Sequence, residues 1–161
     1  MSNYIRPRIP GARIFFTVAL QSRGSDTLVR EVETLRAAVT QTRAERPFRI
    51  DAWVVMPDHM HAVWTLPDRD ADYAVRWSLI KARFSRAVPP GRQRASYVKR
   101  RERGVWQRRF WEHHIRTPEE WAACVHYCHF NPVKHGYVEH PQEWPYSSVH
   151  RAIREGRWKF S

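Results

Sequence analysis

The sequence IDAWVVMPDHMHAVWTL, from Ile50 to Leu66, consists of two apolar runs separated by a proline and an aspartate. The runs Ile50–Met56 and His59–Leu66 are rich in residues that favour strands. Pro57-Asp58 between them is typical of a tight turn. The stretch therefore predicts a β-hairpin of two directly paired strands, and the elements around it can be predicted outward from there.

A strand and a helix precede the hairpin. Residues 14–20 alternate between strongly and weakly apolar positions, which is the period-2 pattern of a strand. Residues 26–39 repeat their apolar side chains at helical spacing, and Ser25 or Asp26 can cap the start of this helix. Its predicted apolar stripe consists of Leu28, Val32, Leu35 and Val39.

Residues 73–84 follow the hairpin and again have a helical apolar stripe. The basic side chains predicted to lie on other faces of this helix are Arg76, Lys81, Arg83 and Arg86. Residues 105–116 alternate loosely and predict a fourth strand. Thr117 can cap a third helix that begins at Pro118 and ends near Phe130, because proline at position 132 cannot continue the hydrogen-bond ladder.

The resulting order is strand, helix, strand, strand, helix, strand, helix. It predicts an α+β fold, a ferredoxin-like split βαβ sandwich with an antiparallel sheet and an additional helix that carries Tyr127. We expect one domain over residues 1–161, with a core at about 10–138 and a C-terminal extension at 139–161 that contains a short helix. Two helices would cover one face of the sheet and leave the other face available.

The charge of the chain is concentrated in one segment. Its 161 residues have a net charge of +12 and a pI near 10.6, which favours a polyanionic partner, either nucleic acid or an anionic membrane surface. Residues 81–116 hold 12 basic and 2 acidic side chains, whereas residues 1–80 and 117–161 have net charges of +2 and 0. The predicted DNA-binding residues are Arg83, Arg92, Arg94, Lys99, Arg100, Arg101, Arg103, Arg108 and Arg109.

Composition excludes several classes of protein. An aromatic content of 13% is too high for a disordered basic tail. The two cysteines, Cys124 and Cys128, cannot form a secreted-type disulfide framework or, by themselves, a structural zinc site. No apolar run is long enough for a membrane span, and residues 1–11 lack the apolar segment of a signal peptide. We therefore expect a cytoplasmic protein.

The pattern His59-Met60-His61 is the sharpest local feature. Residues two apart on a strand point the same way, so both imidazoles leave one face while Met60 packs on the other. Two neutral imidazoles at this separation can bind one divalent ion. Two surface histidines without a ligand would show the same pattern, and a metal site needs at least a third ligand.

The third helix offers candidates for the remaining chemistry. Its predicted buried stripe consists of Trp121, Cys124, Val125 and Cys128. Tyr127 and Asn131, four residues apart, lie on one face at the edge of that stripe. His126 and His129 are expected to face solvent.

A tyrosine hydroxyl is a weak nucleophile at its ordinary pKa near 10, so it needs a metal or a base. A metal held by His59 and His61 would polarise a phosphoryl oxygen while Tyr127 attacks phosphorus. Asn131 would complete the metal shell, and the basic segment would bind the flanking phosphates. The two motifs together predict phosphoryl transfer through a covalent phosphotyrosine.

These motifs resemble those of a known family. The segment from Met56 to His61 is similar to the His-hydrophobe-His motif of single-tyrosine HUH transposases, and residues 127–134, YCHFNPVK, are similar to their tyrosine motif. The branch indicated is that of the REP-associated tyrosine transposases, which are insertion-sequence transposase-like proteins. Residues 106–116 and 144–148 also resemble this branch, so that the resemblance spans about residues 10–150.

The resemblance implies a ferredoxin-like bacterial enzyme, acting at the nucleoid, that cleaves and transfers single-stranded DNA near hairpins of palindromic repeats. It implies Mg or Mn as cofactor, a 5′-phosphotyrosine intermediate and a free 3′-hydroxyl. By position, His59, His61 and Asn131 are implied metal ligands and Tyr127 the nucleophile. We expect a monomer or a homodimer.

Two other functions stay open at the level of sequence. A non-catalytic protein could bind hairpins or single strands through residues 81–116 and aromatic stacking. A zinc-dependent hydrolase could use His59 and His61, but it is disfavoured because a third histidine or a carboxylate at motif spacing is missing.

Overall fold

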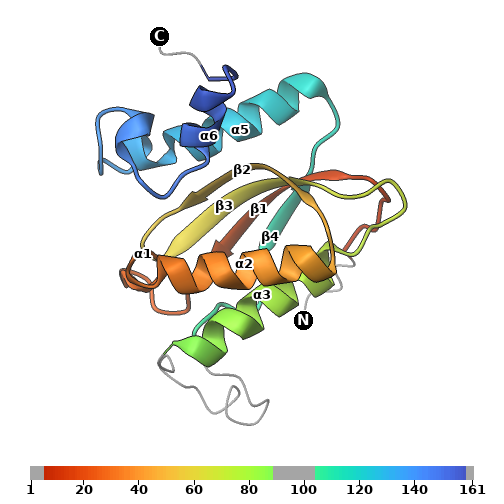
Figure 1. Cartoon of the computed structure of the whole chain (residues 1–161), viewed down its shortest axis with the longest axis horizontal. Helices are drawn as coiled ribbons and strands as arrows, with labels where there is room; N and C mark the ends of the chain where they lie inside the picture. The colour runs from red at the N-terminus through yellow and green to blue at the C-terminus, as the bar shows by residue number, and fades with distance from the viewer. Residues whose placement is uncertain (1–5, 89–103, 159–161) are drawn as a thin grey trace.

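Four antiparallel strands form one sheet in the order β2–β3–β1–β4 (Figure 1). The structure is a computed structural model that describes residues 6–88 and 104–158. The strands are β1 Arg13–Ala19, β2 Arg49–Val55, β3 His59–Thr65 and β4 Trp111–His114. The predicted hairpin is the β2–β3 pair, and the predicted α+β, split βαβ sandwich is confirmed.

Helices cover both faces of the sheet (Figure 1). They are α1 Thr27–Arg30, α2 Val32–Glu45, α3 Tyr73–Ala87, α5 Pro118–Lys134 and α6 Val149–Arg154, with a short 3-10 turn at Pro141–Glu143. Helices α2 and α3 lie on one face, as predicted. The other face is only partly available, because α5 packs against β2 and β3. None of the described helices has the length and apolarity that crossing a membrane requires.

The larger core lies between the sheet and α2 and α3. The alternation of β1 and β3 sends Phe16 and Trp64 into this layer, where both are fully buried. Trp64 stacks on Trp77 of α3 with ring centroids 4.5 Å apart. Phe16, Trp64 and Trp77 contact one another and hold the sheet against α3.

The smaller core lies under α5. Ala52, Val54 and Val63 contribute from the sheet. From α5 come Trp121, Cys124, Val125 and Cys128, the stripe predicted from the sequence. Both cysteines are free. This second core fixes α5, and with it Tyr127, above the strand that carries the two histidines.

Helix α5 continues past the proline that was expected to end it. Thr117 caps its start as predicted, since its side chain accepts a hydrogen bond from Glu120 N. Pro132 lies inside the last turn and is buried, so packing offsets the single ladder bond that it removes. The helix ends instead at Lys134, and Gly136 just beyond it has a φ of 77° that supports the paired bonds Gly136 N to Val133 O and Tyr137 N to Pro132 O.

Two further predictions from the sequence were wrong. Arg76 does not lie on an outer face: it is 1% exposed and donates to both carboxylate oxygens of Asp70 and to the carbonyls of Arg46, Pro47 and Asp72. The fourth strand is limited to β4, with only an isolated bridge between Leu20 and Trp106 before it. The buried guanidinium of Arg76 needs acceptors for its N–H groups, and it finds them in Asp70 and Asp72. Arg76 therefore holds the loop before α3 in place.

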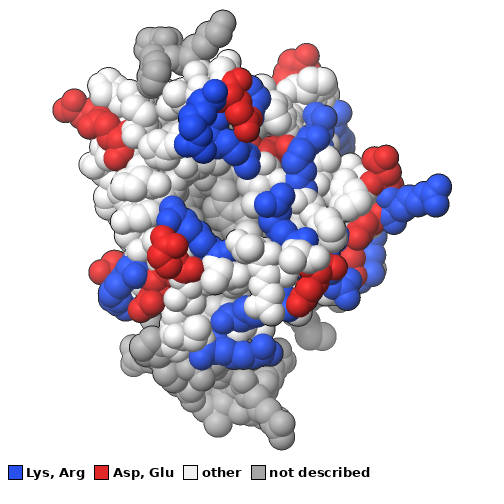
Figure 2. Space-filling view, in the orientation of Figure 1, with Lys and Arg blue, Asp and Glu red and all other residues white. Residues whose placement is uncertain are grey.

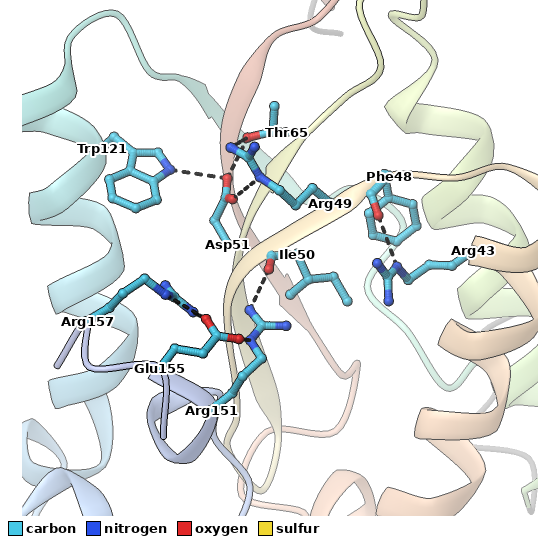
Figure 3. A network of polar contacts seen from close by, with 10 residues as sticks. All are labelled: Arg43, Phe48, Arg49, Ile50, Asp51, Thr65, Trp121, Arg151, Glu155 and Arg157. Carbon is cyan, nitrogen blue, oxygen red and sulfur yellow. Dashed lines mark hydrogen bonds and ion pairs between the residues drawn. The ribbon is translucent and has the colours of Figure 1, made fainter. Parts of the chain in front are cut away.

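A bulge in β2 anchors α5 to the sheet. The pairing of β2 with β3 shifts register between Ile50 and Ala52, which is the effect of a β-bulge. Asp51 at this bulge accepts hydrogen bonds from Trp121 Nε1 at 3.2 Å and from Thr65 Oγ1 at 2.6 Å (Figure 3). The 6% exposed carboxylate also pairs with Arg49. The start of α5 is therefore fixed over the edge strand.

Candidate active site

His59 and His61 project from β3 toward the layer of α5. Their ring centroids lie 5.0 Å apart, and the two residues are 7% and 5% exposed. Met60 between them is fully buried in the opposite core. The alternation predicted from the His59-Met60-His61 pattern therefore places both imidazoles on one face.

Each imidazole is held through its Nδ1 atom. His59 Nδ1 lies 2.8 Å from Asp58 Oδ1, and His61 Nδ1 lies 2.9 Å from Thr17 Oγ1. Because Asp58 is an acceptor, it favours the His59 tautomer with the proton on Nδ1. This arrangement leaves the Nε2 atom of each ring available to bind a metal ion, as in metal sites where a carboxylate orients a histidine.

The electrostatic environment keeps this site in a state that can bind a cation. Burial lowers the pKa of His61 to about 3, and the nearby charges of His59 and His135 add to the effect. Burial alone would raise the pKa of Asp58, but hydrogen bonds from Gly24 and His59 and the charge of Arg23 outweigh it and lower this pKa. At neutral pH the site therefore offers a neutral imidazole at His61 beside an ionised carboxylate.

Helix α5 and the residue that follows it place one aromatic ring against each of the two histidines. The Tyr127 ring lies 5.1 Å from that of His61, and the His135 ring lies 5.4 Å from that of His59, between centroids. Asn131 is four residues from each, so it projects from the same face between them. The extension of α5 past Pro132 is what makes this alignment possible.

Asn131 fits the role of an oxygen ligand. It is 1% exposed, and neither Oδ1 nor Nδ2 of its amide has a hydrogen-bond partner. A buried amide without partners is costly, so it indicates a group that the protein alone does not supply. Across residues 6–88 and 104–158, no three His, Cys, Asp or Glu side chains are placed to hold a metal ion.

Tyr127 combines a fixed ring with an accessible hydroxyl. The residue is 38% exposed, and its ring packs edge-on against Phe15 with centroids 5.7 Å apart. Lys134 Nζ donates to the Tyr127 hydroxyl at 3.3 Å and lies 4.9 Å from the ring centroid. The hydroxyl thus has a cationic donor beside it and open space for a substrate.

The comparison with known proteins identifies the family. A REP-associated tyrosine transposase of Escherichia coli K12 is 42% identical over 156 residues, which cover 97% of this chain and 87% of that protein. This chain belongs to the REP-associated tyrosine transposases. The family predicted from the two motifs is thereby confirmed.

Further comparisons agree with membership in the REP-associated tyrosine transposases. A Haemophilus influenzae protein is also 42% identical, over 159 residues that cover 96% of this chain and 89% of that protein. The solved structure of a REP-associated tyrosine transposase bound to a REP hairpin is 41% identical, covers 99% of this chain and 89% of its own, and has a TM-score of 0.87. No family model matches the sequence.

The histidines flanking Tyr127 in this transposase-family chain differ in role. His126 is exposed, as expected, but the prediction that His129 faces solvent was wrong. His129 is 1% exposed, and its Nε2 lies 2.9 Å from Ser148 Oγ, which also accepts from Trp53 N. His129 therefore connects α5 to β2 and to the C-terminal extension.

The predicted DNA-binding residues have different surroundings. Arg83 connects α3 to α2, because it donates to Thr42 Oγ1 at 2.8 Å and pairs with Glu45. Arg108 and Arg109 are exposed. The other six lie outside the described residues: Arg92, Arg94, Lys99, Arg100, Arg101 and Arg103. The role of the whole set in DNA binding stays a prediction.

A separate hollow lies away from the predicted catalytic residues. It measures about 370 Å³ and lies between α2, the β2 edge and residues 146–148, with Arg36 and Arg43 among its lining residues. Figure 2 shows Lys and Arg side chains around the depression on this face. Neither histidine of β3 lines it, nor does Tyr127 or Asn131. The hollow and the predicted site residues over β3 are therefore separate features of the structure.

Reasoning from the sequence missed four residues of the site: Thr17, Asp58, Lys134 and His135. Asp58 stands directly before His59, and its position was a usable signal because carboxylates often orient metal-binding histidines. Lys134 and His135 could have been found only if the helix had been predicted to continue past Pro132 to Lys134. Thr17 carries no local signal, since its pairing opposite His61 depends on strand register.

Proposed function

We propose that this chain cleaves and rejoins single-stranded DNA near hairpins of palindromic repeats through a 5′-phosphotyrosine formed on Tyr127. The observation that carries the proposal is the packing of Tyr127 over His61, with the unpartnered Asn131 amide beside two histidines anchored through Nδ1. Membership in the transposase family supports it. The DNA class is supported by the relative whose structure is described as bound to a REP hairpin.

The metal ligands that we propose are His59, His61 and Asn131, with Mg or Mn as the ion. These donors fit a divalent ion because two imidazole nitrogens and one amide oxygen suit Mn, and waters can complete the shell of either metal. When bound, the ion supplies positive charge that stabilises the phosphoryl oxygens. Asp58 and Thr17 act by keeping the imidazoles in the required orientation.

The reaction exchanges one phosphate ester for another. The Tyr127 hydroxyl oxygen forms a bond to phosphorus while the bond from phosphorus to the 3′ oxygen breaks. The phenol proton leaves to solvent, and the departing 3′ oxygen takes up a proton to become a free 3′-hydroxyl. Lys134, which donates to the Tyr127 hydroxyl, would stabilise the charge that develops on it. Attack by a 3′-hydroxyl on the phosphotyrosine reverses these steps and joins strands.

The decisive experiment uses a labelled hairpin oligonucleotide with single-stranded arms, incubated with Mg or Mn. The wild type should form a covalent protein–DNA adduct stable to denaturation. Tyr127→Phe should abolish the adduct but retain DNA binding, because only one hydroxyl is lost. His59→Ala should remove both the metal dependence and the adduct.

Tyr137→Phe is the matched control, because Tyr137 is also an exposed tyrosine but packs against Trp144. It should leave the adduct unchanged. Tight binding of the hairpin by wild type with no adduct and no metal effect would contradict the proposal. That result would favour a non-catalytic hairpin-binding protein.

A further inference from the structure

Trp111 is the most exposed large apolar side chain in the described part of the chain. It is 57% exposed, whereas the other seven tryptophans are buried or half-buried. An indole ring is among the largest apolar groups in proteins, so a folded chain loses a large favourable free energy of burial when it leaves the ring in water. An exposed tryptophan beside a reactive site is therefore informative about a partner.

The register of β4 determines the side on which Trp111 lies. Trp111 pairs with Thr17 and His113 with Phe15, on the sheet face toward α5. The alternate residues of β4 face α3, as the contact of His114 with Tyr73 shows. Because α5 packs mainly on β2 and β3, the β1–β4 half of this face is the more open half.

Aromatic contacts connect Trp111 with the reactive residues. The Phe15 ring lies 5.8 Å from Trp111, 5.7 Å from Tyr127 and 5.6 Å from His61, between centroids. His113 lies parallel to Trp111 within 7°, at 6.0 Å. Phe15 is 7% exposed, and it is a shared neighbour of Trp111 and Tyr127 on this face of the sheet.

We propose that Trp111 stacks on an unpaired base of the DNA strand next to the phosphate that Tyr127 attacks. This inference rests on the proposed function and adds a binding subsite to it. A flat aromatic surface suits single-stranded DNA because every base has a π face, and stacking does not require a particular sequence. The subsite would hold the strand in register with the Tyr127 hydroxyl.

The test uses Tyr127→Phe protein without metal, so that no cleavage occurs. Hairpin oligonucleotides carry 2-aminopurine at each position of the single-stranded arms in turn. A base that stacks on the indole should lose fluorescence at one position or at adjacent positions. In the Tyr127→Phe background, a second substitution, Trp111→Leu, should remove this quenching and weaken DNA binding about 5- to 150-fold. Trp111→Phe in the same background should retain most of the quenching and most of the affinity.

Two controls locate the effect. Tyr137→Leu removes another exposed aromatic residue, 52% exposed, and should change neither quenching nor affinity. In an oligonucleotide that lacks the quenched base, Trp111→Leu should cause no further loss of affinity, because the two changes remove the same contact.

Several results would overturn the inference. They are the absence of any quenched position, quenching that persists in Trp111→Leu, and equal weakening with and without the base. A change from dimer to monomer with unchanged DNA binding would assign Trp111 to a contact between copies of this chain. If the Tyr127→Phe protein quenches a base but the wild type forms no covalent adduct with DNA, the proposed function is refuted and the stacking inference is retained.

Discussion

At the scale of single residues, the orientation of the two histidines depends on neighbouring groups that hold their rings. Asp58 orients His59 and is in turn held by Gly24 N at 2.7 Å and Arg23 Nε at 3.0 Å. Thr17 does the same for His61 from the neighbouring strand. Such partners fix the tautomer and the ring orientation, so we expect their loss to weaken the proposed metal binding without removing a proposed ligand.

Asp58→Asn should therefore weaken Mn binding by about 10- to 100-fold, because a neutral amide stabilises a proton on His59 Nδ1 less than the carboxylate does. Isothermal titration with Mn in the absence of DNA measures this directly. Asp68→Asn changes an exposed aspartate and should leave the affinity unchanged. Equal affinities for Asp58→Asn and wild type would show that Asp58 does not orient a metal ligand.

At the scale of elements, the position of α5 decides whether Tyr127 meets the histidines. The bulge at Asp51 anchors the start of the helix through Trp121 (Figure 3). The buried stripe of α5 holds the middle of the helix. Without the bulge, the alternation of β2 would point the Asp51 side chain toward α2 and α3. The bulge turns it toward α5 instead. This single carboxylate thus connects the edge strand to the start of α5.

Asp51→Ala should lower the free energy of unfolding by about 1–3 kcal/mol, because it leaves Trp121 Nε1 and Thr65 Oγ1 without their buried acceptor. Amide exchange in the first turns of α5 should also become faster. Urea unfolding and hydrogen exchange measure the two effects. Asp51→Asn keeps one acceptor oxygen and should lose less stability. An unchanged exchange rate in α5 would mean that the second core alone holds the helix.

At the scale of the whole molecule, the C-terminal extension closes the structure over α5 and the β2 edge. His129 bonds to Ser148, and residues 146–148 pair with β2 through Val55 N to Tyr146 O and Ser148 N to Trp53 O. Burial lowers the pKa of His129 to about 4, with the charge of Arg157 adding to the effect. The folded chain thus keeps His129 neutral where the unfolded chain would protonate it.

The fold should consequently lose stability as the pH falls from about 6.5 toward 4. In that window His129 is protonated in the unfolded state but stays neutral in the folded state. The free energy of unfolding therefore falls by about 3 kcal/mol over the full shift. Urea unfolding at pH 7.5 and pH 4.5 measures it. His129→Gln can still bond to Ser148 but does not titrate, so its stability should fall less over this range. Parallel losses in wild type and variant would exclude His129 as the source.

Local sequence signals predicted the elements that depend on near neighbours. The hairpin around Pro57-Asp58 and the cap at Thr117 follow from turn and capping chemistry within a few residues. The placement of His59 and His61 on one face follows from the period of a strand. These features are independent of distant contacts, so the composition of a short window was sufficient.

Other features depend on energies that arise only when distant segments meet. Pro132 is tolerated in α5 because its surroundings bury it, and the helix ends at Lys134 instead. Arg76 and His129 are buried because carbonyls and a hydroxyl from other segments satisfy them. The amino-acid order contained the reactive groups and the local elements that carry them. Their meeting over β3 came from long-range packing, because burial, register and partner bonds are properties of the assembled layers and not of any short stretch.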